Sequence, residues 1–261
     1  MPLVSCDDTG LRTAIAGVSS GDAIDLTACS TITLTAGDIF VNVDDLTLNG
    51  PGAEQLTIDG GLSAFSYGRV FRHTGFGTLA INGMTLGDAE YASVIQGSNV
   101  KGGCIYSAGS VALNDAVVTG CTLAAFTSDY ALGGAIYARK NMTLVDSTIA
   151  ASLAYSAGNE AEGGGVFVRG TFTATESSIA GNTVVAPYSY ASGGGVVVLG
   201  TGDFAIVRST LFGNAADFSG GAYVNTTGNV DLINSTISAN YASLLSAGGA
   251  FIPAATLTNS T

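Results

Sequence analysis

The sequence predicts an all-β fold, a right-handed single-stranded parallel β-helix (solenoid), because two short patterns recur along it and its composition suits buried strands. The first pattern is a Gly-Gly pair, a small residue and then apolar residues, and its copies begin at Gly102, Gly133, Gly163, Gly193, Gly220 and Gly248. The second is an apolar run followed by Ser-Thr and an apolar residue, as in Leu144 to Ile149. A unit of about 30 residues cannot bury its own apolar face, so successive units must stack as coils.

Composition excludes several other classes of protein. Hydrophobic residues make up 47% of the chain and charged residues only 11%, whereas disorder requires low hydrophobicity and high charge. Gly, Ser, Thr and Asn interrupt every apolar run before it reaches ~18 residues, so this segment is not expected to insert into a membrane. The net charge of −12 repels phosphate groups, which makes nucleic acid a poor partner.

The chain is expected to form one domain, with residues 1–20 as an N-terminal cap and residues 21–261 as stacked coils. A solenoid must shield the open end of its core. Leu11 to Ala16 suits a short helix in that cap, with one of Asp7 to Thr9 as its N-cap. Because Thr261 lies inside a repeat, the domain is expected to be truncated there and to associate end to end through an unpaired strand edge.

Three asparagines are expected to stack on one another. Asn182, Asn214 and Asn240 each follow an apolar residue by three positions in the repeat. In register on neighbouring coils their side-chain amides would form a ladder along one turn, and a simple turn preference is the alternative explanation.

The four cysteines fall into two local pairs and lack the spacing of a zinc site. Cys6 and Cys29 flank the predicted helix, and a disulfide between them would fix the cap. For Cys104 and Cys121, a disulfide and two buried free thiols are both open. No signal peptide precedes this segment, so the chain is either cytosolic or has lost a leader that would direct it out of the cell.

The repeat resembles that of known surface proteins. The segment Gly133–Ile136 (Gly-Gly-Ala-Ile), with the apolar-x-x-Asn segments that end at Asn182, Asn214 and Asn240, is similar to the repeat of chlamydial-type polymorphic outer-membrane proteins. More broadly, it resembles the β-helical passengers of autotransporters. The resemblance implies a bacterial β-helix that is extracellular or at the cell surface and acts as an adhesin-like module.

Aromatic residues in the segments between repeats are the candidate ligand-binding residues. Aromatic faces stack on sugars, and tyrosines make adaptable contacts at protein interfaces. The alternative is that these rings stack on one another and only cover the edge of the solenoid. The candidates for binding an extracellular glycan or protein are Tyr130, Tyr155, Tyr188, Tyr190 and Tyr241.

An acidic column is the one candidate metal site. Asp115, Asp146 and Glu176 occupy the same position on three consecutive repeats, and Arg208 follows on the fourth. Stacked carboxylates recruit a cation or raise one another's pKa, and oxygen ligands suit Ca²⁺. The alternative is a solvated column that Arg208 terminates. No other cofactor is expected.

The sequence predicts a non-catalytic module for adhesion, or for binding a glycan or protein. The alternative is a polysaccharide lyase or glycoside hydrolase of the pectin-degrading β-helix type, since the fold alone does not decide function. The single histidine, His73, is interpreted as a surface or cap residue rather than a catalytic one. A groove lined by charged residues would favour the enzyme, and stacked tyrosines would favour binding. A threonine column that includes Thr148, Thr210 and Thr236 suggests an ice-binding face as a third, weaker hypothesis.

Overall fold

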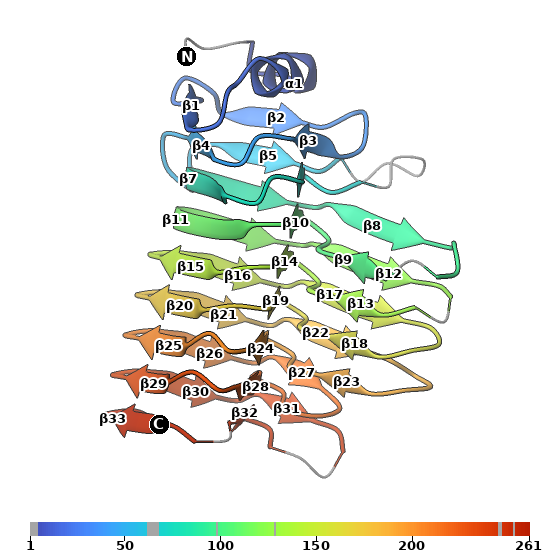
Figure 1. Ribbon diagram of the computed structural model, residues 1–261, viewed down its shortest axis with the longest axis vertical. Helices are drawn as coiled ribbons and strands as arrows, with labels where there is room; N and C mark the ends of the chain where they lie inside the picture. Colours follow the sequence, from blue (N-terminus) through green and yellow to red (C-terminus); the bar gives the residue numbers. More distant parts are fainter. Residues whose placement is uncertain (1–4, 62–67, 98, 128, 245–246, 253) are drawn as a thin grey trace.

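The protein is a right-handed parallel β-solenoid of about seven turns, as the sequence predicts. The computed structural model describes residues 5–61, 68–97, 99–127, 129–244, 247–252 and 254–261. Figure 1 shows the coils stacked along the long axis, with the N-terminal helix at one end and β33 at the other. Among the described residues, no helix is long and apolar enough to cross a membrane.

The N-terminal cap contains α1 (Asp8–Ala16), which starts three residues before the predicted segment. Asp7 is its N-cap, because the carboxylate accepts a hydrogen bond of 2.7 Å from the backbone N–H of Gly10. Leu11, Ala14 and Ile15 point from the helix into the core. The predicted disulfide Cys6–Cys29 is present and ties the chain before α1 to the first coil.

Two sheets enclose the larger part of each coil, which we name the body. Within the described residues, sheet A contains β1 (Asp22–Asp25), β2 (Thr31–Thr33), β4 (Leu46–Asn49), β5 (Thr57–Asp59), β7 (Thr78–Gly87), β11 (Ser110–Thr119), β15 (Met142–Val145), β16 (Thr148–Ala150), β20 (Phe172–Thr175), β21 (Ser178–Ala180), β25 (Phe204–Val207), β26 (Thr210–Phe212), β29 (Val230–Ile233), β30 (Thr236–Ser238) and β33 (Thr256–Thr258). Sheet B contains β3 (Ile39–Val41), β6 (Phe71–His73), β10 (Ile105–Ser107), β14 (Ile136–Ala138), β19 (Val166–Val168), β24 (Val196–Gly200), β28 (Ala222–Thr226) and β32 (Ala250–Phe251).

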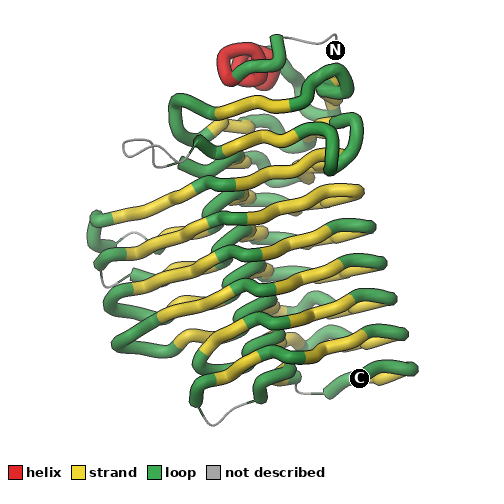
Figure 2. The backbone as a smooth tube through the Cα atoms, turned by 180° about the vertical axis from the view of Figure 1, so that it is seen from behind, coloured by secondary structure: helices red, strands yellow, loops and turns green. Residues whose placement is uncertain are grey.

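Two shorter sheets enclose a second part, which we name the lobe. Sheet C contains β8 (Glu90–Ser93), β12 (Thr122–Ala125), β17 (Leu153–Ser156), β22 (Thr183–Val185), β27 (Ala215–Ala216) and β31 (Tyr241–Ala242). Sheet D contains β9 (Val100–Lys101), β13 (Ala131–Leu132), β18 (Ala161–Glu162) and β23 (Ala191–Ser192). In each middle coil the chain runs through sheets B, A, C and D in turn, and Figure 2 shows the lobe extending to one side of the body.

The body and the lobe have separate hydrophobic cores. The body core is built from large side chains such as Phe172, Phe204 and Ile149, which alternate with outward residues along each strand. The lobe core is built mainly from alanines, among them Ala154 and Ala161. Small residues allow sheets C and D to approach closely, so the lobe is thin.

The Gly-Gly pairs form a neck between the two cores, and the two glycines are needed for different reasons. Gly133 has a φ of +77°, a conformation that L side chains rarely adopt. Gly134 packs against the backbone of the opposite wall, where a Cβ would lie 2.6 Å from the carbonyl carbon of Leu153. No side chain fits there, and the coil is pinched into two compartments.

Strand register corrects the repeat alignment at its last two copies. β24 pairs with β28 so that Val196 lies beside Ala222, which aligns Gly220 with Gly194 rather than with Gly193. Ser219 then takes the position of positive φ, at +56°. The pair Gly220-Gly221 therefore corresponds to Gly194-Gly195, and the pairing of β28 with β32 keeps Gly248 in the column of Gly220.

The asparagine ladder is confirmed, and it fills the neck. Asn182 donates from Nδ2 to Oδ1 of Asn214 over 3.0 Å, and Asn214 donates in the same way to Asn240. Each Nδ2 also donates to a backbone carbonyl oxygen, that of Ile149 for Asn182 and that of Ile179 for Asn214. These amides stand opposite glycine, since a Cβ on Gly165 would lie 3.1 Å from Asn182 Nδ2.

Cys104 and Cys121, whose redox state was open from the sequence, form a disulfide. Strand register places Cys121 in the column of Ser152 and Asn182, and it places Cys104 in the column of Ala135. The disulfide therefore crosses the neck at the position that Gly165 and Asn182 occupy two coils further on. Described cysteines include no free thiol.

Candidate functional site

A column of aromatic residues runs along the outer face of sheet B. In β14 the side chains of Ile136 and Ala138 point into the body core, so Tyr137 between them points outward. Strand register stacks the residues at this position in the order Phe40, Arg72, Tyr106, Tyr137, Phe167, Val197, Tyr223 and Phe251. Tyr137 stacks on Tyr106 and on Phe167, with ring centroids 5.7 and 5.5 Å apart.

Sheet D faces this column across a concave corner, which we name the B–D corner. The corner forms because the chain turns at the Gly-Gly pair as it passes from sheet D to sheet B. Leu132 of sheet D packs with Tyr137, Phe167 and Val197 of sheet B in a small hydrophobic cluster outside the two cores. The outward positions of sheet D in this column are Lys101, Leu132, Glu162 and Ser192.

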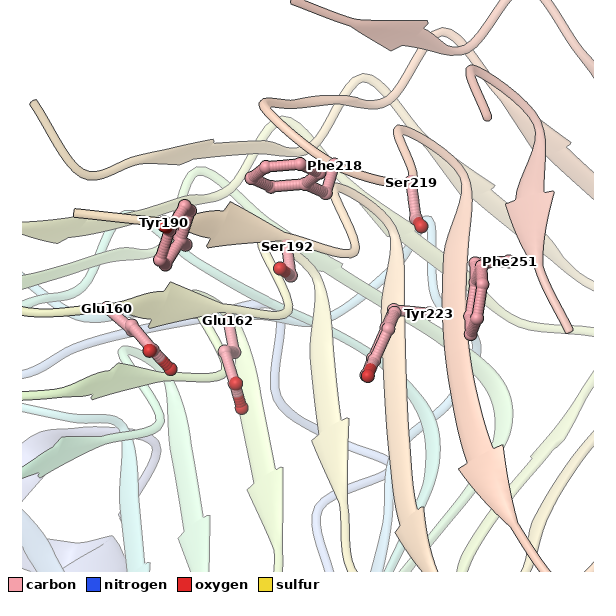
Figure 3. A pocket seen from close by; sticks show the side chains of 8 residues that line it. All are labelled: Glu160, Glu162, Tyr190, Ser192, Phe218, Ser219, Tyr223 and Phe251. Atoms are coloured by element: carbon pink, nitrogen blue, oxygen red, sulfur yellow. The ribbon is translucent and has the colours of Figure 1, made fainter. Parts of the chain in front are cut away.

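A pocket of about 340 Å³ opens at the C-terminal half of the B–D corner. Figure 3 shows Glu160, Glu162 and Ser192 on one side of it and Tyr223 and Phe251 on the other. The remaining lining residues are Tyr190, Phe218 and Ser219. The pocket thus combines aromatic rings with two carboxyl groups, two serine hydroxyls and two tyrosine hydroxyls.

Glu162 is the most perturbed acid in the pocket. Its burial, followed by the negative charge of Glu160, raises the pKa of Glu162 to about 7, and Arg169 opposes this increase. The carboxyl group is therefore partly protonated at neutral pH, and it can both donate and accept a hydrogen bond.

The predicted tyrosines do not form one site. Tyr130 packs against the hydrophobic cluster of the B–D corner, and Tyr190 lines the pocket. Tyr155 instead contacts Phe126, with ring centroids 5.9 Å apart. Tyr188 and Tyr241 are 86% and 63% exposed, and neither lines the pocket. Ring-on-ring packing, which was the alternative, is found at Tyr155 and also at Tyr190, whose ring centroid lies 5.4 Å from that of Phe218. Tyr130 and Tyr190 belong to the corner.

The acidic column stacks in register at a bend of sheet A. Asp115, Asp146, Glu176 and Arg208 share a positive φ of 47° to 51°. Partial desolvation, together with the hydrogen bond and charge of Glu176, raises the pKa of Asp146. Arg208 lies 2.6 Å from Glu176 and lowers the pKa of that carboxyl group. In the part of the chain that the structure describes, no three acidic, histidine or cysteine residues are grouped to hold a metal ion, and calcium binding here stays a prediction.

His73 is buried, so its interpretation as a surface or cap residue is wrong. Its Nε2 lies 3.0 Å from the carbonyl oxygens of Val43 and Asp44 and therefore carries the proton, and Nδ1 lies 2.8 Å from Ser107 Oγ. Burial lowers the pKa of the imidazole, which favours the neutral ring. The strand pattern explains the error: Phe71 and His73 both point inward, and only Arg72 between them is exposed.

Sequence reasoning missed the aromatic column of sheet B. The signal was present, since an aromatic residue follows Gly-Gly, a small residue and an aliphatic residue at Tyr106, Tyr137 and Phe167. Comparison of this chain with protein-family models, with curated proteins and with solved structures finds no match.

Proposed function

We propose that this protein is a secreted or cell-surface β-helical binding module that takes a glycan in the pocket of the B–D corner. The observation that carries the proposal is the lining of that pocket. Tyr223 and Phe251 stack on each other, with their ring centroids 5.4 Å apart, and together they form an aromatic wall against which the apolar side of a sugar can pack. Glu160, Glu162 and Ser192 face them and supply hydrogen-bonding groups for sugar hydroxyls.

Two further features support an extracellular location. All four cysteines are paired, and structural disulfides persist in oxidising compartments. The Gly-Gly and apolar-x-x-Asn segments resemble those of bacterial polymorphic outer-membrane proteins and autotransporter passengers, which favours an adhesin-like role at a bacterial surface. Both features are independent of the pocket.

A second candidate function is glycoside hydrolysis in the same pocket. Glu160 and Glu162 are two residues apart and both line the pocket, so their Cα atoms are roughly 7 Å apart along the strand. Hydrolysis needs one protonated and one ionised carboxyl group about 5 to 9.5 Å apart. The raised pKa of Glu162 fits the acid, and Glu160 would supply the second carboxyl group.

A glycan array tests the binding proposal, with wild-type protein compared against Tyr223→Ala. The matched control is Phe212→Ala, because Phe212 is an exposed aromatic residue on the outer face of sheet A. We expect a defined set of glycans to bind wild type and the control, and Tyr223→Ala to lose about tenfold in affinity. Equal binding by wild type and Tyr223→Ala would exclude the pocket.

Turnover distinguishes the two candidate functions. Incubation of the bound glycans with wild type should release no reducing ends if the module only binds. Release that disappears in Glu162→Gln would instead establish hydrolysis.

A further inference from the structure

Three basic side chains, Lys101, Arg139 and Arg169, come together in the B–D corner on the N-terminal side of the pocket. Arg139 and Arg169 follow β14 and β19 directly and lie at equivalent positions on adjacent coils. Lys101 comes from β9 of sheet D, on the opposite wall. The Lys101 ammonium lies 5.3 Å from the ring centroid of Tyr137, and the Arg169 guanidinium lies 5.7 Å from that of Phe167.

None of these three cations lies within 4.0 Å of a carboxylate oxygen among the described ion pairs, and the acid that interacts with Arg169 at longer range is Glu162. The pairs found within 4.0 Å are Arg12 with Asp8, Arg69 with Asp38, and Arg208 with Glu176. Lys101 is half-buried, and its desolvation, with the positive charges of Arg169 and Arg139, lowers its pKa. Neighbouring like charges destabilise each other until an anion neutralises them.

The placement is notable because the chain is acidic overall. It has 20 acidic and 8 basic residues, yet three of the basic residues meet beside the aromatic column. Coils rise by about 4.8 Å, so the guanidinium groups of Arg139 and Arg169 can both reach one anionic group. Arginine binds carboxylate and sulfate through a planar pair of N–H donors, and lysine adds a point charge.

We propose that Lys101, Arg139 and Arg169 form an anion site that binds a carboxylate or sulfate group of an acidic polysaccharide, with Tyr137 beneath it. The inference rests on the proposed glycan-binding function and gives its ligand class. The polymer lies along the aromatic column, with its acidic groups over these three residues and neighbouring sugars towards Tyr223. Single-stranded DNA carries anionic groups of the same kind, so the experiment includes it as the competing occupant.

Affinity measurements with four immobilised polymers test the proposal: polygalacturonate, dextran sulfate, neutral dextran and single-stranded DNA. The variants are Arg169→Gln and Lys101→Met, and the control is Arg208→Gln, a basic residue on the outer face of sheet A. We expect each site variant to weaken binding of the acidic polysaccharides by about tenfold. The affinity of Arg208→Gln should stay within about twofold of that of wild type, because Arg208 belongs to an exposed ion pair. Added salt should lower the affinity of wild type more than that of the two site variants.

The outcomes separate this inference from the proposed function. Unchanged affinity of Arg169→Gln and Lys101→Met for both acidic polysaccharides overturns the anion site, and so does tighter binding of DNA than of either polysaccharide. If those variants lose binding while Tyr223→Ala does not, the anion site stands and the pocket fails. If wild type binds dextran as tightly as polygalacturonate and dextran sulfate, the pocket stands and the anion site fails.

Discussion

The body and the lobe share one chain and one coil spacing, yet they are built from different side chains. The body is filled by Phe, Leu, Ile and Val, and the lobe is filled largely by alanine. Between them the neck admits only small residues on one wall, namely Gly, Ala or Cys, and Asn, Ser or Cys on the other. We infer that the B–D corner is a consequence of the neck, because the close backbone approach at Gly134 is where the chain passes from sheet D to sheet B. Changes at the neck should therefore cost the most, and changes on either outer face should cost less.

Removal of one rung of the asparagine ladder is expected to have the largest effect. Asn214→Leu leaves the backbone N–H and Nδ2 of Asn182 without their acceptor and the carbonyl of Ile179 without its donor. Each buried group left unpaired costs about 1–3 kcal/mol, so we expect a loss of about 4 kcal/mol in the free energy of unfolding. Urea denaturation measures it, and Asn114→Leu, on the exposed face of sheet A, should change stability by less than about 0.5 kcal/mol. Equal stability of the two variants would contradict the role of the ladder.

The disulfide form of the neck should be the next most costly to remove. Cys104→Ala with Cys121→Ala opens a link across 17 residues of sequence. Such a crosslink adds about 3 kcal/mol, chiefly by restricting the unfolded chain. Chemical denaturation of the double variant and of the oxidised wild type measures this difference in the free energy of unfolding. No difference between them would mean that Ala135 and Ser152 on the next coil already hold the neck closed.

Glu162 on the outer face of the lobe should make stability depend on pH. Its folded pKa of about 7 exceeds the ordinary 4.5, so the folded protein keeps a proton that the unfolded chain has lost between these values. Its contribution is favourable at low pH and is lost as pH rises from about 5 to about 7.5, by roughly 2–3 kcal/mol at most. Glu162→Gln should lack this part of the profile. If the free energy of unfolding depended on pH in the same way for wild type and for Glu162→Gln, the carboxyl group would be solvated in the folded protein.

Replacement of the Ala135 and Ser152 pair by the glycine and asparagine pair found on the next coil should have the smallest net effect on stability. Ser152→Asn alone should be destabilising by about 1–3 kcal/mol, because Ala135 occupies the space that Gly165 leaves open beside Asn182. Adding Ala135→Gly should bring stability back to within about 1 kcal/mol of wild type and extend the ladder by one rung. A double-mutant cycle measures the coupling. Additive effects would show that the glycine and asparagine positions are independent.

The sequence was sufficient to predict the coils, the cap helix, the Cys6–Cys29 disulfide and the asparagine ladder, because each depends on a repeat or on neighbouring residues. The lobe was not predicted, since alanine-rich strands such as Ala161–Glu162 carry little hydrophobic alternation. The B–D corner needed the angle between two sheets, which depends on the backbone approach at Gly134. Tyr190 could be named from the sequence because it is an aromatic residue between two repeats. Its neighbours in the pocket, Glu162 and Tyr223, could not, because only the corner brings them together.

Amide chemical-shift mapping by NMR tests most directly whether the B–D corner is the binding site. The titrant would be the glycan that binds most tightly on the array. Perturbations should concentrate at Glu162, Ser192, Tyr223 and Phe251, with the outer face of sheet A around Thr148 unchanged. Perturbations centred on sheet A, with none at these four residues, would contradict the assignment of function to the corner.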